Sequence, residues 1–404
     1  MKNSDGTLAW LRDRNRHRVM EILRMQSQVS QADLARATGL SRTTVSSLIA
    51  ELKDAGLVLD AEPTPRQARG GRPGVQLVLQ DPSLVVAGID FGHSHVGVAI
   101  SDLAHHLLAE RRYELDVNRQ AVQALDAAAR MFAEVLSRAG MDRRSVLRAG
   151  IGIPGPVDRA RGTAGSSTIL PGWVGLSIAS EMGERLGVPV EIENDANLGA
   201  LAELTWGAGR DCSNFAYVKA ATGIGAGIVI EGRLLHGVTG TAGEIGHTSL
   251  QEAGDICRCG SRGCLETHAS GAAIAALLSR SLAETLTLED VLARAVDGDP
   301  GCRRALADAG RHIGAAVADL CNLINPERIV VGGSMAVAGD VLLDPLREAV
   351  GLRAIPSAAE DVEIVPGELG ARAELLGAVA LVLHEAGPAW SGPAPAVRQS
   401  TATT

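Results

Sequence analysis

The stretches VVAGIDFGHSHVGVAISD at residues 85–102 and FAYVKAATGIGAGIVIEG at residues 215–232 follow one plan. Each predicts a strand, a turn that carries glycine, and a second strand. Two lobes that each open on such a hairpin would place two backbone-lined turns on one cleft, a geometry suited to holding phosphate groups. We therefore expect an α/β fold of two lobes over residues 81–386, which we call the body.

The length and composition of the chain limit the kinds of protein it can be. Its 404 residues exceed the usual size of one compact core, which predicts two or three folding units. Apolar residues make up 46% and aromatic residues only 2%, so the cores must rest on Ala, Val, Leu and Ile. The N-terminus lacks the apolar core of a signal peptide, and no apolar run reaches membrane-spanning length. We therefore expect a cytoplasmic protein with no membrane insertion.

The net charge of −9 hides an asymmetry along the chain. Residues 1–80, which we call the head, hold 12 Lys and Arg against 8 Asp and Glu. The remaining 324 residues hold 26 basic against 39 acidic side chains. A basic head on an acidic body is typical of a polyanion-binding module attached to a second functional unit.

Three helical signals follow one another in the head, beginning with an amphipathic stretch over residues 15–26. Ser30 and Asp33 have the spacing of a capping box that opens a second helix. Gly39 suits the left-handed end of that helix, and Ser41 can cap a third helix. The inward face of the third helix would hold Val45, Leu48, Ile49 and Leu52. This order predicts a helix-turn-helix.

The outward face of the third helix is short and polar. A face of this kind, at the start of the second helix of such a pair, is where side chains contact bases in the major groove. The alternative is a small helical hairpin with a solvated face. The side chains expected to contact DNA are Arg42, Thr43, Ser46 and Ser47.

A wing is predicted at residues 60–75, between short strands at 57–59 and 75–79. Its segment PTPRQARGGRPG contains three arginines and no acid. Arg72 could enter a minor groove while Arg69 contacts phosphates. The same Gly- and Pro-rich segment also serves as a linker to the body. We therefore predict a winged helix-turn-helix that binds a double-stranded DNA operator.

A zinc loop is predicted at residues 247–264, where His247, Cys257, Cys259 and Cys264 supply one imidazole and three thiolates. Cys257 and Cys259 are too close in sequence for an easy disulfide, and the intervening glycines let the third thiolate reach the same ion. The alternative is three reduced structural cysteines in a loop. Because four protein ligands leave no open position, the expected Zn²⁺ is structural rather than catalytic.

Several motifs of the body resemble those of the ROK family, which comprises repressors, open reading frames and kinases. The family has an actin-like, hexokinase-type (ribonuclease H-like) fold, in which two lobes enclose a sugar cleft. The resemblance covers nearly the whole chain. The motifs are DFG at residues 90–92, GIPGP at 152–156, ENDAN at 193–197, TGIGAG at 222–227, GEIGH at 243–247 and CRCGSRGCLE at 257–266.

The resemblance implies a sugar site of carboxylates, an amide and an imidazole, comprising Asn194, Asp195, Glu244, His247 and Glu266. In the kinases of the family, the residue that matches Asp195 accepts the proton of the attacking sugar hydroxyl, so Asp195 is the catalytic candidate if the chain is a kinase. The alternative role of Asp195 is a helix cap. For Glu244 and Glu266 the alternative is ordinary surface acid.

The nucleotide side departs from the pattern of the kinases. Their sequence Asp-x-Gly-Gly-Thr becomes DFGHS at residues 90–94, where His93 replaces a glycine and should hinder the approach of ATP. The matching phosphate and nucleotide loops, which we regard as possible remnants, comprise Asp90, Gly92, Thr222, Gly223, Gly225, Gly332 and Gly333. We expect ATP and Mg²⁺ only if the chain is an active kinase.

Two hypotheses about function follow. In the first, the chain is a repressor of carbohydrate-metabolism genes, and a sugar or sugar phosphate changes the spacing of the two heads in a homodimer or tetramer. In the second, the body is an ATP-dependent hexose kinase similar to glucokinase, with an added DNA-binding head. The intact head and the altered DFGHS turn favour the regulator. The tail at residues 387–404, rich in Pro, Ala, Ser and Thr, is expected to be disordered.

Overall fold

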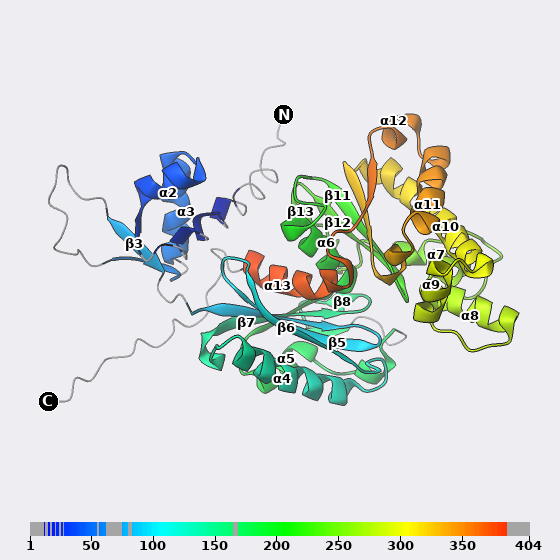
Figure 1. Cartoon of the computed structure of the whole chain (residues 1–404), viewed down its shortest axis with the longest axis horizontal. Helices are drawn as coiled ribbons and strands as arrows, with labels where there is room; N and C mark the ends of the chain where they lie inside the picture. Colours follow the sequence, from blue (N-terminus) through cyan, green and yellow to red (C-terminus); the bar gives the residue numbers. More distant parts are fainter. Residues whose placement is uncertain are drawn as a thin grey trace. The chain divides into compact units, whose positions relative to one another are not determined.

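The computed structural model describes residues 28–54, 56–61, 75–79, 83–164 and 169–385, with scattered residues between 12 and 26. These residues form two compact units (Figure 1). Of the described residues, one unit contains those between 12 and 84, the turn at 102–106 and residues 383–385, and the other contains those of 85–101 and 107–382. None of the helices in the described ranges combines the length and the apolar character that a bilayer crossing requires.

The head is a winged helix. Helices α2 (Gln31–Thr38) and α3 (Arg42–Asp54) pack on an antiparallel sheet of order β1-β3-β2, formed by Val29–Ser30, Gln76–Leu79 and Val58–Asp60. The predicted capping box is confirmed, because the Asp33 backbone N–H donates to Ser30 Oγ and the Asp33 carboxylate accepts from the Ser30 backbone. Gly39 ends α2 with a φ of 73°, as the sequence predicts. The two strands flanking the wing each begin one residue later than predicted.

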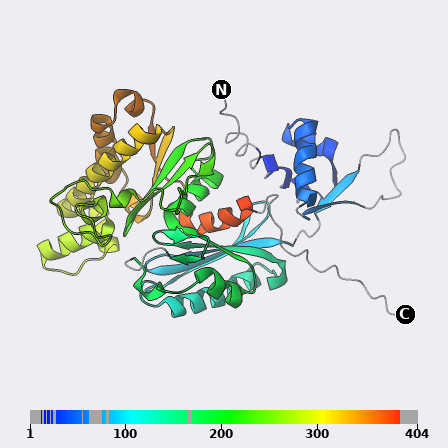
Figure 2. The ribbon, with the colours of Figure 1, turned by 180° about the vertical axis from the view of Figure 1, so that it is seen from behind.

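The first lobe of the body is built on a five-stranded sheet of order β10-β7-β4-β5-β6. Strands β4, β7 and β10 are parallel, and β5 and β6 are antiparallel to their neighbours. Helices α4 (Ala121–Arg138) and α5 (Ile178–Leu186) cover one face, side by side in Figures 1 and 2. The strands are β4 (Val85–Phe91), β5 (His95–Asp102), β6 (Leu107–Glu114), β7 (Val146–Ile153) and β10 (Val190–Asn194), with a small hairpin of β8 (Val157–Asp158) and β9 (Thr163–Ala164).

The second lobe repeats this topology in the order β13-β12-β11-β14-β15. The two similar hairpins predicted from the sequence are β4 with β5 and β11 with β12. Strands β11, β14 and β15 are parallel, while β12 and β13 are antiparallel. The strands are β11 (Phe215–Ala220), β12 (Ile224–Ile230), β13 (Arg233–Leu234), β14 (Arg328–Gly332) and β15 (Glu363–Pro366). The helices on this lobe are α7 (Leu265–Ala269), α8 (Gly271–Leu282), α9 (Leu288–Val296), α10 (Pro300–Ile324), α11 (Asp340–Arg353) and α12 (Pro356–Ala359).

Two helices lie between the sheets, α6 (Asp195–Trp206) and α13 (Ala373–Glu385) (Figure 1). Helix α13 approaches the first-lobe sheet closely, since a Cβ atom at Gly150 would lie 2.0 Å from the carbonyl oxygen of Ala378. The two helices also cross tightly, because a Cβ at Gly377 would lie 2.0 Å from the carbonyl oxygen of Leu198. Such contacts require glycine. These close contacts position the first turns of α6 and α13 at the junction of the lobes.

Candidate functional site

One cleft between the lobes collects most of the residues singled out in the sequence. The first turn of the body reaches it through Gly92 and His93, and the zinc loop through His247 and Arg258. Asp90 and Gly332 are not among the residues lining the cleft. The other predicted residues that line it are Asn194, Asp195, Thr222, Gly223, Gly225, Glu244, Glu266 and Gly333. The predicted sugar site and both glycine turns therefore share one cleft.

The start of α6 positions Asn194 and Asp195. Asn194 is the N-cap residue, since its Oδ1 accepts the backbone N–H groups of Ala196 at 2.9 Å and Asn197 at 3.1 Å. Its amide Nδ2 donates to the carbonyl oxygen of Gly155 at 2.9 Å. Asp195 is the first residue of the helix, and its Oδ1 also accepts from Ala196 at 2.8 Å. The principal cap is thus Asn194, whereas the cap considered in the sequence was Asp195.

A buried lysine faces Asp195. Lys219 Nζ, on β11, donates to Asp195 Oδ2 at 2.7 Å and lies 3.4 Å from Glu374 Oε1, on the first turn of α13. The side chains are 18%, 11% and 9% exposed, respectively. Burial would lower the pKa of Lys219, but the charges of Asp195 and Glu374 hold it well above its usual range. The side chain of Lys219 is therefore charged at neutral pH.

Glu193 anchors the strand that precedes this helix. Its carboxylate accepts from the Asn194 backbone N–H at 2.8 Å and from Asn197 Nδ2 at 2.9 Å, and it lies 2.8 Å from His236 Nε2. Burial would raise the pKa of Glu193, but the hydrogen bonds of His236 and Asn197 hold it below its usual range. Because His236 belongs to the second lobe, this contact ties the loop before Glu244 to the first lobe.

The second lobe contributes the carboxylates of Glu244 and Glu266. Glu266 Oε1 lies 2.6 Å from a guanidinium nitrogen of Arg258, and its Oε2 accepts the backbone N–H of Ile224 at 3.4 Å. Burial raises the pKa of Glu244 to about 7, and the charges of Asp195 and Glu266 add to the effect. Three carboxylates thus interact across the cleft, offering several hydrogen-bond acceptors to a polyhydroxyl ligand.

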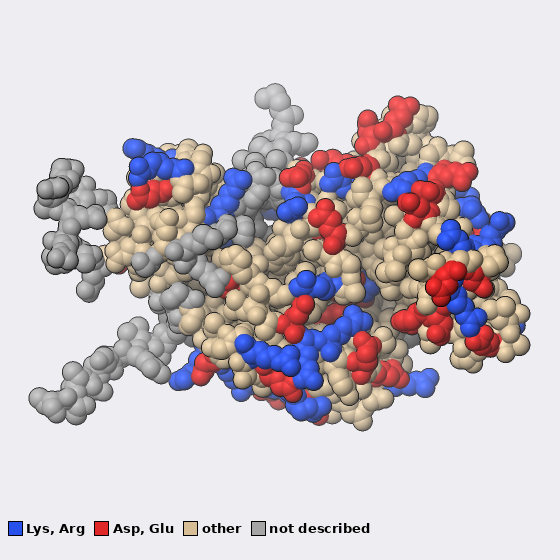
Figure 3. All heavy atoms as spheres, in the orientation of Figure 1, with Lys and Arg blue, Asp and Glu red and all other residues tan. Residues whose placement is uncertain are grey.

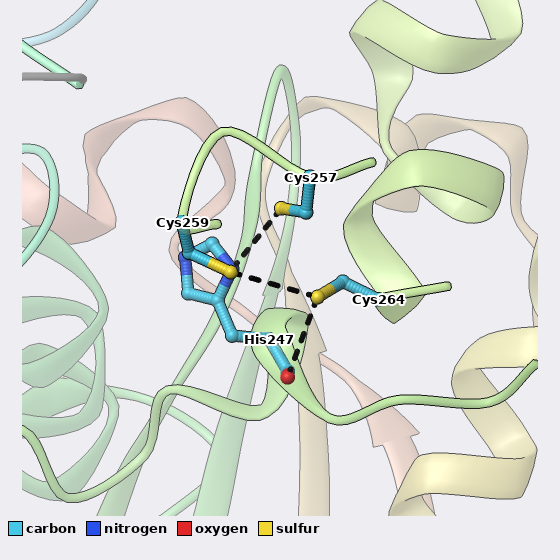
Figure 4. Close-up of side chains that lie close together, drawn as sticks. All are labelled: His247, Cys257, Cys259 and Cys264. Carbon is cyan, nitrogen blue, oxygen red and sulfur yellow. Dashed lines mark hydrogen bonds between the residues drawn. The ribbon is translucent and has the colours of Figure 1, made fainter. Parts of the chain in front are cut away.

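The predicted zinc ligands converge into one cluster (Figure 4). The ligand atoms of His247, Cys257, Cys259 and Cys264 lie within 4.8 Å of one another. Cys257 Sγ is 3.6 Å from His247 Nδ1, and Cys259 Sγ is 3.7 Å from Cys264 Sγ. Tetrahedral zinc with bonds of about 2.3 Å to sulfur requires ligand separations of about 3.8 Å. The cluster therefore fits a tetrahedral ion.

The electrostatics of the cluster agree with this geometry. Burial and the neighbouring thiols raise the pKa of the Cys264 thiol to about 12, so this thiol ionises readily only when a cation joins the cluster. The ring of His247 presents Nδ1 to the thiols and Nε2 to Glu244, 3.8 Å from its Oε2. The His/Cys cluster and the cleft therefore share His247.

The first turn of the body is occupied by imidazole rings. His95 Nε2 lies 2.7 Å from Asp90 Oδ2, and its ring covers Gly92, where a Cβ would lie 2.0 Å from His95 Cε1. His93, which the sequence marks as an obstacle to phosphate, turns its Nδ1 toward Asn118 Oδ1 at 2.6 Å. Burial lowers the pKa of His93, so this ring stays neutral. His95 thus lies closest to the glycine of the turn.

In the head, the four predicted DNA-contacting residues of α3, namely Arg42, Thr43, Ser46 and Ser47, are all exposed. The opposite face is buried and contains Val45, Leu48, Ile49 and Leu52, as predicted. Ser41 caps the helix by accepting the backbone N–H of Thr44 at 3.1 Å. Arg69 and Arg72, most of the predicted wing at 60–75 and the predicted tail at 387–404 lie outside the described residues.

Several site residues were missed in the sequence. Lys219 is the one charged residue in the apolar strand FAYVKA, and Arg258 lies between two predicted metal ligands. A lone charge in a buried strand and an arginine within the zinc loop are local features that could have indicated both residues. Glu374 and His236 had no such signal, because their partners are far away in the sequence.

Comparisons with known proteins agree with this architecture. Residues 86–385 match the ROK family and residues 13–70 match the MarR family. The xylose repressor of Bacillus spizizenii is 30% identical, over 90% of this chain and 93% of the repressor. The N-acetylglucosamine repressor of Escherichia coli is 29% identical, over 93% and 94% of the two chains. The glucokinase of Halalkalibacterium halodurans is 33% identical, over 74% of this chain and 94% of the enzyme.

Solved structures give the same two kinds of relative. The crystal structure of a ROK family transcriptional regulator, a homologue of the E. coli MLC protein, covers 93% of this chain and 98% of its own, with 27% identity and a TM-score of 0.72. A ROK family glucokinase from Streptomyces griseus, solved with glucose and AMPPNP, covers 74% and 98%, with 28% identity and a TM-score of 0.66. The regulators match head and body, and the kinases match the body.

Proposed function

The chain belongs to the ROK family, and we propose that it is a sugar-responsive transcriptional repressor. Its DNA-binding part is the MarR-type winged helix of the head, and its sensor is the cleft of the body. The observation that carries the sensor is the convergence of Asp195, Glu244 and Glu266 with the His247 cluster in one cleft. A DNA-binding regulator of this kind acts in the cytoplasm, where the operator lies.

The DNA contacts proposed for the head divide by groove. Arg42, Thr43, Ser46 and Ser47, at the exposed start of α3, face bases in the major groove. Arg69 and Arg72 contact phosphates and the minor groove. Because a bacterial operator of two half-sites needs two heads, we propose a homodimer, with tetramers as an extension of it.

The effector proposed for the cleft is an uncharged sugar rather than a sugar phosphate. The cationic side chains that line the cleft already have acidic partners: Lys219 pairs with Asp195, Arg258 with Glu266 and Arg112 with Glu114. A phosphate would have to displace one of these partners. Hydroxyl groups can instead donate to the carboxylates and accept from the Nε2–H of His247, and the relatives are repressors named for xylose and N-acetylglucosamine.

Zinc is the ion proposed for the cluster, held by His247 Nδ1 and the thiolates of Cys257, Cys259 and Cys264. Three thiolates and one imidazole favour zinc over oxygen-seeking cations. When bound, the ion supplies structural cross-linking of the loop. The loop then holds Arg258 against Glu266 and fixes the ring of His247 beside Glu244.

Sugar controls DNA binding in this proposal by shifting the population of lobe arrangements. A sugar that contacts both Asp195 in the first lobe and Glu244 in the second stabilises the arrangement in which both reach it. The heads of a dimer then change their separation and lose the operator. The experiment uses the full chain and a DNA fragment that it selects from a random-sequence pool, and measures release of this fragment on addition of xylose, glucose and N-acetylglucosamine.

The second candidate is an ATP-dependent hexose kinase. It is favoured by the presence of Asp195 at the cleft and by the glucokinase relatives. A coupled assay of ADP release with a panel of hexoses decides it, with Asp195→Asn as the control. Turnover by the wild type well above that control would establish kinase activity. Equal rates of ADP release from the two proteins would leave the repressor as the supported function.

A further inference from the structure

Three carboxylates lie near Lys219, and each is paired with a nitrogen-bearing side chain of the protein itself. Asp195 and Glu374 share Lys219, at 2.7 Å and 3.4 Å from its Nζ atom. Asp90 Oδ2 lies 2.7 Å from His95 Nε2. Lys219 also experiences the charge of Asp90. The negative charges here are therefore already balanced in part without any bound ion.

A magnesium nucleotide needs free oxygen ligands at this place. Mg²⁺ binds through one or two carboxylates together with phosphate oxygens, and it demands a regular shell at about 2.1 Å. A general base also needs an oxygen that can receive the proton of a sugar hydroxyl. Asp195 and Glu374 do not fit the first requirement, because the ammonium of Lys219 contacts both carboxylates. Asp90 Oδ1 is buried without a hydrogen-bond partner, but its other carboxylate oxygen is held by His95.

Both carboxylate oxygens of Asp195 accept hydrogen bonds from the protein, which leaves about one of their four lone pairs for a sugar hydroxyl. Its Oδ2 accepts from the ammonium of Lys219, and its Oδ1 accepts from the Ala196 backbone N–H and from Asn194 Nδ2 at 3.2 Å. Glu374 Oε1 accepts from the hydroxyl group of Tyr217 at 3.4 Å. A divalent ion would have to lie where the ammonium lies, and two cations at that separation repel strongly in a buried site.

The place of Lys219 in the fold keeps its ammonium beside Asp195 and Glu374. Lys219 lies on β11 of the second lobe, Asp195 on the first turn of α6 and Glu374 on the first turn of α13. The ammonium thus joins the second-lobe sheet to both central helices. A bound metal ion exchanges with solvent, but a side chain does not.

We propose that Lys219 is a specificity-determining residue that takes the position of a divalent cation, so that the cleft accepts a sugar but no magnesium nucleotide. Asp195 then serves the sugar as a fixed, charged hydrogen-bond acceptor and does not take its proton. This inference rests on the proposed function of the body as a sensor. It attributes the inability to bind a magnesium nucleotide to one residue, Lys219.

The experiment measures binding of Mn²⁺ to the full chain by electron paramagnetic resonance of the free ion. Mn²⁺ prefers oxygen ligands, so the zinc cluster does not compete for it. Wild type and Lys219→Arg, which keeps the charge, should show no site in the cleft. Lys219→Gln should gain one site that binds Mn²⁺ at least about tenfold more tightly than any site of the wild type, because two buried carboxylates lose their counter-ion.

The inference is overturned if Lys219→Gln binds Mn²⁺ no more tightly than wild type, or if Lys219→Arg gains the same site. Should Lys219→Gln fail to fold, the wild type still decides: Mg²⁺ with AMPPNP should leave its Tm unchanged. A rise in Tm that needs both Mg²⁺ and AMPPNP would overturn the inference. Failure of the proposed function has a separate signature, the absence of sugar-dependent release of the selected DNA fragment.

Discussion

The Nε2 atom of His247 lies 3.8 Å from the carboxylate of Glu244, while Nδ1 of the same ring lies 3.6 Å from Cys257 Sγ. One side chain thus belongs both to the His/Cys cluster and to the cleft between the lobes. Because the ring is also attached to the backbone through Cβ, an ion that holds Nδ1 fixes the ring orientation, and Nε2 keeps its place beside Glu244. Removal of the metal should therefore damage sugar recognition without reaching the head.

The metal prediction follows from this geometry. We expect purified protein to contain about one zinc ion per chain, and Cys257→Ser to lose it together with the sugar response. Metal analysis and sugar-dependent release of DNA are the two measurements. Cys302→Ala, a buried cysteine of α10 outside the cluster, is the matched control and should keep the zinc. A metal-free Cys257→Ser protein that still responds to sugar would refute the proposed role of the ion.

For the wing, we predict that Arg72→Ala weakens binding to the selected DNA fragment and to other DNA sequences by a similar factor. The substitution should also reduce the salt dependence of this binding. An arginine in the minor groove lies between two phosphate backbones and releases about one counter-ion, so its loss lowers the slope of log K against log salt by about 0.9. The measurement is fluorescence anisotropy over a range of salt. Arg138→Ala, at the end of α4 in the body, is the control for a lost surface charge. An unchanged slope in Arg72→Ala would remove the wing from the interface.

The recognition helix should behave differently from the wing. Arg42 is exposed at the start of α3, and we expect Arg42→Ala to cost about 1–3 kcal/mol on the selected fragment while relaxing the choice of base at one position. Selection from a random pool with the variant reads out that base preference. If Arg42→Ala selects the same sequence as wild type, Arg42 contacts only the DNA backbone.

The pH dependence of stability should report Glu193. Its pKa lies below the usual value of 4.5, so its charged form stabilises the folded state above pH 4.5 and this contribution is lost as pH falls through the lowered pKa. Glu193→Gln should therefore lower Tm at pH 7, by an amount that shrinks at acid pH. Glu360→Gln, an exposed acid on the same lobe as His236, is the control. A Tm difference that does not change with pH would contradict the pairing with His236.

Local patterns of sequence were sufficient for much of the fold. Ser30 and Asp33 form the predicted capping box because a cap depends only on residues three apart. The two hairpins and the convergence of the four predicted metal ligands were also found, since glycine turns and cysteine spacing are local features. Figure 3 shows acidic and basic side chains interspersed on the visible face of the body, so its acidic surplus marks no single patch there.

The missed parts of the site depend on contacts between distant segments. Lys219 meets Glu374 only because α13 returns to the cleft 155 residues later in the chain. His95 was passed over in favour of His93, because the family pattern marks position 93, whereas the structure places the ring of His95 against Gly92. Spacing along the chain could not show whether the ring of His93 or that of His95 lies against the turn at Gly92.

The most direct test of the account is a titration of sugar against the complex of the full chain with its selected DNA fragment. We predict that at least one of xylose, glucose and N-acetylglucosamine releases the DNA from wild type. Asp195→Asn should bind the same DNA with unchanged affinity and release it at no sugar concentration, because its amide changes the acceptor in the cleft and leaves the head intact. Equal release from wild type and Asp195→Asn would contradict the proposal that this cleft is the sensor.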